Sequence, residues 1–168
     1  AYGVLARLLT MNREYHPALL AARKALALNP NNAQVRFAHA FALTFAGDLD
    51  EALLELDEVA RLSPCDPNLW SFMIMRAWVL LALERYEEAT DWARSSAEQP
   101  NSVLWPAVTL ISLLGHLERF NEARAVYSRL REVDPDRDLI AVWDILPFRD
   151  PEHHSRLVEG VRKARVLE

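Results

Sequence analysis

The side chains that could perform chemistry in this chain are few, and they do not cluster in the sequence. Among the five histidines only His153 and His154 are adjacent, and they follow Glu152 where a helix is expected to begin. Neighbouring residues on a helix point about 100° apart, so this pair is poorly placed to hold one metal ion. His39 and His116 fall inside expected helices, where we interpret them as packed or surface residues. No catalytic or metal-ligating residue is therefore expected.

The other nucleophilic and acidic groups are equally isolated. The single cysteine, Cys65, has no histidine near it in the sequence to activate the thiol. The acidic pairs at 57–58 and 87–88 fall on expected solvated helix faces, and nothing sets two carboxylates across a cleft. No Cys-x-x-Cys, His-Glu-x-x-His or glycine-rich phosphate loop occurs. We therefore predict that this chain is not an enzyme and binds no cofactor.

Composition limits which classes of partner and which cellular compartment are expected. The net charge of −5 argues against direct nucleic-acid binding. One cysteine permits no internal disulfide, which favours a reducing, cytoplasmic setting. The longest apolar run, at 77–83, is too short to span a membrane, so no membrane partner is expected. The sequence starts without methionine and in the middle of a pattern, from which we expect a fragment of a longer protein.

The strongest pattern in the chain is a repeat. Four alanines recur at intervals of 34, 37 and 34 residues, each three residues after a tyrosine, leucine or phenylalanine. A period near 34 indicates stacked helix pairs. Small residues at fixed positions let paired helices approach closely, and a larger side chain there would cost roughly 1–3 kcal/mol through overpacking. These alanines are Ala18, Ala52, Ala89 and Ala123.

The second repeat predicts its helices most clearly. Apolar residues recur at helical spacing over 32–46, and Gly47 is expected to end that helix in a left-handed conformation. The next helix is predicted over 49–62, before a Ser-Pro pair that cannot continue it. Asp48, with Glu51 three residues later, matches a capping box at the start of this second helix.

The longer interval of 37 residues falls in the third repeat. We interpret it as three extra residues in the first helix of that repeat, with Asp66 as the N-cap and Pro67 at the first helical position. In the fourth repeat the expected N-cap is Asn101 or Ser102, and Pro106 falls in the first turn of the helix.

A proline follows each of the four alanines after 11 or 12 residues, at Pro30, Pro64, Pro100 and Pro135. These small, aromatic and proline positions resemble those of the tetratricopeptide repeat. The resemblance implies an all-α fold, a right-handed superhelix of antiparallel helix pairs with a C-terminal capping helix. It covers 1–136 as four repeats, of which the first is truncated, at 1–32, 33–66, 67–101 and 102–136. The remaining 137–168 departs from the repeat. We expect a short helix over 138–145 and a longer one over 151–164, capped by Asp150, to close the array.

The same resemblance implies a site. In that family the first helix of each pair lines a concave surface that holds a peptide or a helix. Arg7 is the only cation at these positions, so a clamp for a terminal carboxylate is not expected. We predict that the aromatic residues anchor an apolar or amphipathic protein segment; alternatively, they pack inside the array or are covered by the C-terminal tail. The predicted groove residues are Arg7, Gln34, Phe37, Phe41, Ile74, Trp78, Trp105, Thr109, Ser112 and His116.

A second resemblance concerns the tail. The sequences LPFRDP at 146–151 and LVEGVRKA at 157–164 look like the end of bacterial multidomain regulators that carry such repeats. In those proteins a class III adenylate/guanylate cyclase domain or a winged-helix DNA-binding domain comes first. The leading hypothesis is a protein–protein interaction module from a bacterial signalling protein. The alternatives are a regulatory or dimerisation domain of such a cyclase, or part of a winged-helix transcription regulator.

The truncated first repeat leads to one more expectation. Without helices before it, apolar residues of its first helix should be exposed, and such patches tend to find a partner. We therefore predict self-association through this end of the chain. The residues expected to be exposed are Tyr2, Leu5 and Leu9.

Overall fold

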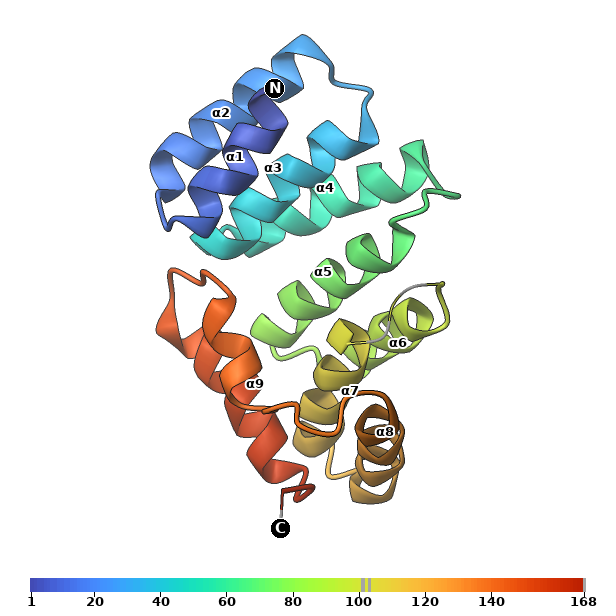
Figure 1. Ribbon diagram of the computed structural model, residues 1–168. Helices are drawn as coiled ribbons and strands as arrows, with labels where there is room; N and C mark the ends of the chain where they lie inside the picture. Colours follow the sequence, from blue (N-terminus) through green and yellow to red (C-terminus); the bar gives the residue numbers. More distant parts are fainter. Residues whose placement is uncertain (101, 103, 168) are drawn as a thin grey trace. The chain divides into compact units, whose positions relative to one another are not determined.

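The computed structural model describes residues 1–100, 102 and 104–167, and the regular structure within them is entirely helical. It consists of nine α-helices and one 3-10 helix, η1 (Figure 1). The helices are α1 (Tyr2–Met11), α2 (Tyr15–Leu28), α3 (Ala33–Ala46), α4 (Leu49–Leu62), α5 (Leu69–Ala82), α6 (Tyr86–Ala97), α7 (Leu104–His116), α8 (Phe120–Val133), η1 (Ala141–Ile145) and α9 (Pro151–Lys163).

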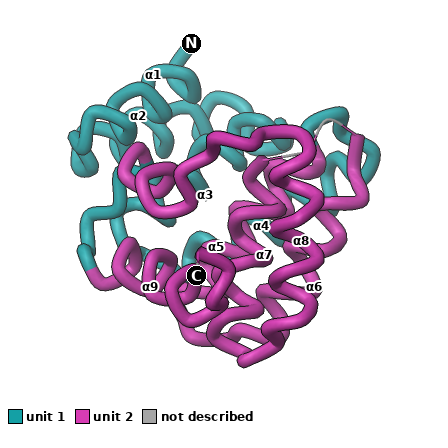
Figure 2. Tube along the Cα trace, turned by 60° about the horizontal axis from the view of Figure 1, so that its bottom comes forward, with its two compact units in different colours: residues 1–68, 146–151 teal, residues 69–145, 152–168 magenta. Residues whose placement is uncertain are grey.

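The chain divides into two compact units, coloured separately in Figure 2. Unit 1 contains Ala1–Asn68, and therefore α1–α4, together with the tail segment Leu146–Pro151. Unit 2 contains Leu69–Ile145 and Glu152–Glu168, and therefore α5–α8, η1 and almost all of α9. The tail thus contributes to both units. The expected division into an array over 1–136 and a tail over 137–168 stays a prediction.

The repeated alanines occupy the closest contacts between helices. Ala18, Ala52, Ala89 and Ala123 are each 0% exposed. Each lies in the first turn of the second helix of a pair, which brings that helix against its neighbours. Because no space surrounds these methyl groups, the sequence can accept only a small residue at this position.

Each helix pair is joined by the same turn. The residue two positions before each second helix has a left-handed backbone, with φ values of 62° at Arg13, 97° at Gly47, 60° at Glu84 and 57° at Glu118. The backbone N–H of the following residue donates to a carbonyl five residues earlier, as in Asp48 to Leu43. This is the Schellman arrangement, which satisfies carbonyls that the ending helix leaves unpaired. Only one of the four turns uses glycine for it.

The three extra residues of the third repeat lie outside its first helix, so the expectation of a longer helix was wrong. α3 and α5 both have 14 residues. The loop before α5, at 63–68, is two residues longer than the one before α3, at 29–32. The turn after α5, at 83–85, is one residue longer than the turn at 47–48. A loop accepts added residues without shifting the faces of a packed helix, which is why the insertion lies there.

The expectation that Gly47 ends α3 in a left-handed conformation was right, and the capping box expected at the start of α4 was wrong. Asn32, the N-cap of α3, accepts a hydrogen bond from the Val35 backbone N–H at 3.0 Å. The Asp48 side chain makes no such bond at the start of α4. A capping box also needs the Asp48 backbone N–H for the Glu51 side chain, but the turn already donates that N–H to Leu43.

The start of α5 also differs from the expectation. The helix begins at Leu69, so Pro67 lies in the preceding turn and not at the first helical position. Asp66 orders this turn instead of capping the helix: its Oδ1 accepts from the Asn68 backbone N–H at 2.8 Å, and its Oδ2 accepts from the Ser63 hydroxyl at 3.2 Å. The Gln34 side chain also donates to Asp66.

The fourth repeat and the tail follow the prediction more closely. Pro106 is in the first turn of α7, as expected, and Asn101 lies outside the described residues. In the tail, α9 begins at Pro151 as predicted, whereas the short helix η1 begins at Ala141. The Asp138 carboxylate accepts the backbone N–H groups of residues 140 and 141, and this turn delays the start of η1.

The shared turn yields a stability prediction. A Cβ atom at Gly47 would meet nothing within 4 Å, so Gly47→Ala should cost only the left-handed backbone strain, about 1 kcal/mol. Glu118→Gly should relieve the same strain and raise the free energy of unfolding by about 0.5 kcal/mol, because glycine also loses more entropy on folding. Urea unfolding of both variants measures the two changes. Glu118→Ala keeps the Cβ and is the matched control. If Glu118→Ala raises the free energy of unfolding as much as Glu118→Gly does, backbone strain is not the explanation.

Candidate functional site

The predicted groove residues lie on α1, α3, α5 and α7, the first helices of the four pairs. Their register is the same when counted from the left-handed turn residue. Arg7, Phe41, Trp78 and Ser112 each lie six residues before it. The sequence therefore identified one equivalent face of each first helix. What covers that face differs from helix to helix.

In unit 1 the predicted face is partly open. Arg7 and Gln34 are exposed, Phe41 is half-buried, and Phe37 is buried. The guanidinium carbon of Arg7 lies 5.7 Å from the ring centroid of Phe37 and 5.3 Å from that of Phe41. These distances fit a cation–π contact. Gln34 donates to the Asp66 carboxylate at 3.1 Å. The accessible surface is a guanidinium lying on an aromatic pair.

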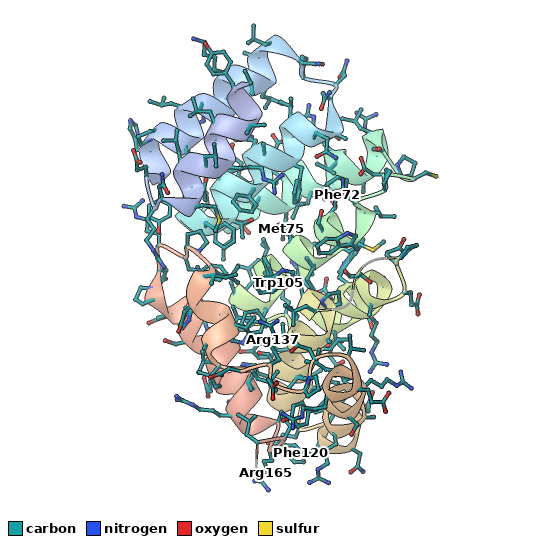
Figure 3. All side chains as sticks on the ribbon, in the orientation of Figure 1. Phe72, Met75, Trp105, Phe120, Arg137 and Arg165 are labelled. Carbon is teal, nitrogen blue, oxygen red and sulfur yellow. The ribbon has the colours of Figure 1, made fainter. Side chains whose placement is uncertain are left out.

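In unit 2 most of the predicted face is buried. Ile74, Trp78 and Thr109 are at most 6% exposed, and the indole N–H of Trp78 donates to the Thr109 hydroxyl at 2.9 Å. Trp105, labelled in Figure 3, is half-buried, and its ring centroid lies 5.3 Å from that of Trp78. Trp143 of η1 packs against both rings, with centroid distances of 6.5 and 6.0 Å. These aromatic residues form a core that the tail completes.

The tail helix α9, whose place in the fold Figure 1 shows, contacts the end of the predicted face on α7. The hydroxyl of Ser112 donates to the backbone carbonyl of Leu157 at 2.8 Å. The Nε2 atom of His116 donates to the backbone carbonyl of Arg156 at 2.8 Å. Ser112 is buried and His116 half-buried. At these positions the expected open groove is corrected: the chain's own C-terminal helix occupies it, which was the alternative interpretation.

Two glycines allow this contact. A Cβ atom added at Gly115 of α7 would lie 1.9 Å from the carbonyl oxygen of Gly160. One added at Gly160 of α9 would lie 2.3 Å from both the carbonyl oxygen and the hydroxyl of Ser112. The backbones of the two helices are therefore in direct contact. This close approach brings Ser112 and His116 within hydrogen-bonding distance of the α9 carbonyls. Any side chain at either glycine would force them apart.

The surroundings of His116 favour its neutral form. Its ring stacks on Tyr86, with centroids 4.4 Å apart and planes at 3°. Burial lowers the pKa of His116, and the hydrogen bond to the Arg156 carbonyl opposes that shift. A neutral ring with its proton on Nε2 is the tautomer that can donate to this carbonyl. Burial also raises the pKa of Tyr86. His116 thus fastens α9 and has the environment of a structural residue.

Three tail residues belong to this region although the sequence did not indicate it. Arg156 donates to the backbone carbonyl of Ala82 and pairs with Glu84 at 2.9 Å. Trp143 is 0% exposed, and Gly160 sits in the middle of a helix. A mid-helix glycine often marks a close backbone contact, and this was the one signal in the sequence that could have revealed the docking of α9.

The described residues offer no evident place for a metal. Within 1–100, 102 and 104–167, no group of three or more His, Cys, Asp or Glu side chains is arranged to hold an ion. The adjacent histidines behave separately, because His153 is buried and His154 lies 3.2 Å from the Asp144 carboxylate. Cys65 is exposed. In the same described part of the chain, no helix has the length and apolarity needed to cross a membrane.

The α7–α9 contact gives a second prediction. Gly160→Ala should lower the free energy of unfolding by about 1–3 kcal/mol, because the new methyl group meets the Ser112 backbone carbonyl, which cannot move aside without shifting α7. Hydrogen exchange should accelerate in 151–163. Ser155→Ala, at an exposed position of the same helix, is the matched control. A Gly160→Ala protein as stable as this control would contradict the close contact.

Comparison with known proteins adds two findings on sequence. No protein-family model matches the chain. The transcriptional regulator HilA of Salmonella typhimurium is 30% identical over 122 residues, as is HilA of Salmonella typhi. The match covers 70% of this chain and 22% of HilA, so the chain spans about a fifth of the curated relatives that it matches.

Solved structures resemble the chain over nearly its whole length. YrrB, described as a TPR protein with an unusual peptide-binding site, superposes with a TM-score of 0.64 at 19% identity, over 97% of this chain and 82% of YrrB. MamA from AMB-1 superposes with a TM-score of 0.68 at 16% identity, over 99% of this chain and 97% of MamA. The 34-residue spacing, the helix pairs with their shared turn, and these matches together show that the chain has the tetratricopeptide-repeat fold.

Proposed function

We propose that this chain is a protein–protein interaction module, without enzymatic activity of its own, that binds a partner segment on the open face of unit 1. The observation that carries this proposal is the exposed Arg7 guanidinium lying on Phe37 and Phe41. The fold supports the general class, since repeat arrays present extended surfaces for other proteins. The description of YrrB as a peptide-binding protein is consistent with this class.

The chemistry of this face suggests what it binds. Phe41 is only partly buried and can contact an apolar side chain, and aromatic residues are common among those that dominate binding energy. The Arg7 guanidinium makes no hydrogen bond or ion pair with another described residue, so its N–H groups are available to a carboxylate. We infer an amphipathic partner segment that places an apolar side chain on Phe41 and an acidic group near Arg7.

Affinity capture with matched variants tests the proposal. A partner is first captured by the wild-type chain from a bacterial lysate and identified, and its dissociation constant is then measured. Phe41→Ala should weaken binding by about thirtyfold, equivalent to about 2 kcal/mol. Arg7→Gln should weaken it too, and more at low than at high salt. Phe37 is less suitable because it is 4% exposed, and its removal would also destabilise the core.

The control is Leu54→Ala, which removes an equally apolar but 67% exposed side chain from α4. Circular dichroism and urea unfolding verify that every variant folds. If folded Phe41→Ala and Arg7→Gln bind the partner as tightly as Leu54→Ala does, this face of unit 1 is not the binding surface.

The parent protein is the finer part of the proposal. We infer that the chain comes from a transcription regulator, because the 30% identity to HilA favours that alternative over a nucleotide cyclase. DNA would then be contacted by residues outside this chain, in keeping with its net charge of −5. The coding sequence upstream of Ala1 distinguishes the two: a basic recognition helix supports a regulator, and paired metal-binding aspartates support a cyclase.

Self-association through α1 is a further part of the proposal. The helix exposes Val4, Leu5, Leu8 and Met11 by 44–65%, four apolar side chains on one short helix. Of the residues expected from the sequence, Leu5 is exposed, whereas Tyr2 and Leu9 are partly buried. We infer that a second copy of the chain covers this patch, because exposed apolar side chains this close together favour contact with another such patch.

Sedimentation velocity over a range of protein concentrations tests this interface. The wild-type chain should show a rising sedimentation coefficient, and Leu8→Glu should remove the rise by placing a charge in the apolar contact. Leu28→Glu changes a 70% exposed leucine on α2 and is the control. A wild-type chain that stays monomeric at high concentration would overturn the interface.

A further inference from the structure

The side chains that connect the first helix of a pair to the second differ between repeats. In repeat two these positions of the first helix hold Arg36 and His39 of α3. Arg36 pairs with Glu55 of α4 at 2.8 Å, and His39 Nδ1 lies 3.3 Å from the same carboxylate. In repeat three, Arg76 of α5 lies over the Trp92 ring of α6 at 4.7 Å. Long polar or aromatic side chains occupy these positions in both repeats.

Repeat four has small apolar residues at the equivalent positions. Counted from the left-handed turn residue, Ala107 corresponds to Arg36, Leu110 to His39 and Arg76, and Val126 to Glu55 and Trp92. These side chains are shorter, and room remains between α6, α7 and α8.

That room is present in the structure as two adjoining cavities. One has a volume of about 350 Å³ and the other of about 320 Å³. Both are lined by Ala97 of α6, Leu110 of α7, and Val126 and Arg129 of α8. We call the two together the α6–α8 cavity. Its size is that of a site for a small ligand or for one or two large side chains.

The charge around the cavity is uneven. Arg129 is the only charged residue among the described residues that line the larger part, and it makes no hydrogen bond or ion pair with another described residue. Along the smaller part, Arg94 and Glu122 are paired with each other, and Glu98 also lines it. The larger part therefore combines an apolar floor with one available guanidinium.

We propose that the α6–α8 cavity binds a segment of a partner protein through a bulky apolar side chain that has a carboxylate beside it. The apolar side chain lies beside the positions that Arg36, His39 and Arg76 occupy in the earlier repeats, and the carboxylate pairs with Arg129. This site is separate from the face of unit 1 proposed above, and each can be tested without the other.

Two small molecules provide the probe. N-acetyl-L-phenylalanine carries an apolar ring and a carboxylate, and N-acetyl-L-phenylalaninamide carries the same ring without the charge. Titrations are followed by NMR on the isotopically labelled chain of 168 residues. We expect saturable shifts at the amides of Ala97, Leu110 and Val126, and about fivefold tighter binding of the acid than of the amide.

Two variants assign the binding to the proposed groups. Arg129→Gln should bind the acid and the amide equally, because only the charge contact is lost. The double variant Ala107→Arg, Val126→Glu rebuilds the ion pair of repeat two in repeat four and should abolish binding of both probes by filling the cavity. Leu54→Ala, on α4, should bind both probes as the wild type does.

The outcomes separate the proposal from its competitors. If the wild-type chain binds the acid and the amide with equal affinity, Arg129 does not pair with the carboxylate, and the proposal is overturned. Shifts confined to the exposed face of α1, or none at millimolar probe, would also overturn it. Concentration-dependent shifts at the cavity amides without any probe would assign the cavity to a second copy of this chain instead. Loss of capture by the Phe41→Ala variant bears only on the face of unit 1 and leaves this test unaffected.

Discussion

The close approach of paired helices is the constraint on which the rest of this structure depends. Four alanines with no exposed surface set the distance between neighbouring helices, and four left-handed turns set where each second helix begins. Together they fix the register of each first helix against its second helix. Side chains six residues before each turn therefore lie on the equivalent face of each first helix, whatever their chemistry. Variation between repeats can therefore change a surface without changing the scaffold.

The contact between α7 and the tail helix α9 also depends on small residues. Gly115 and Gly160 allow α7 and α9 to approach closely enough for Ser112 and His116 to bind backbone carbonyls of the tail helix. Glycine is needed here for its size and not for a special backbone angle, since both residues are helical. The result is that unit 2 presents a face filled by the chain itself. This is why we place the proposed partner site in the first-helix register on unit 1.

Much of the helical framework was predictable because local patterns determine it. The bounds of α4 and the start of α9 agree with the prediction, and Gly47 ends α3 in the left-handed conformation expected from the sequence. The capping box predicted at Asp48 does not form, because the Asp48 backbone N–H already donates to the Leu43 carbonyl in the turn. The insertion in the third repeat was assigned to a helix because periodicity reports how many residues are added and not where. Only the helix bounds distinguish a loop from a longer helix.

The sequence by itself determined the repeat, the residues at the close contacts and the face of each first helix. These depend on spacing along the chain, which periodicity records directly. Only the tertiary structure decided which of the ten groove residues are accessible, because exposure depends on residues distant in sequence. Ser112 is covered by Leu157, and Trp78 by Trp143. The α6–α8 cavity likewise could not be recognised from the sequence. Ala107 and Val126 show their significance only when their positions in the structure are compared with those of Arg36 and Glu55.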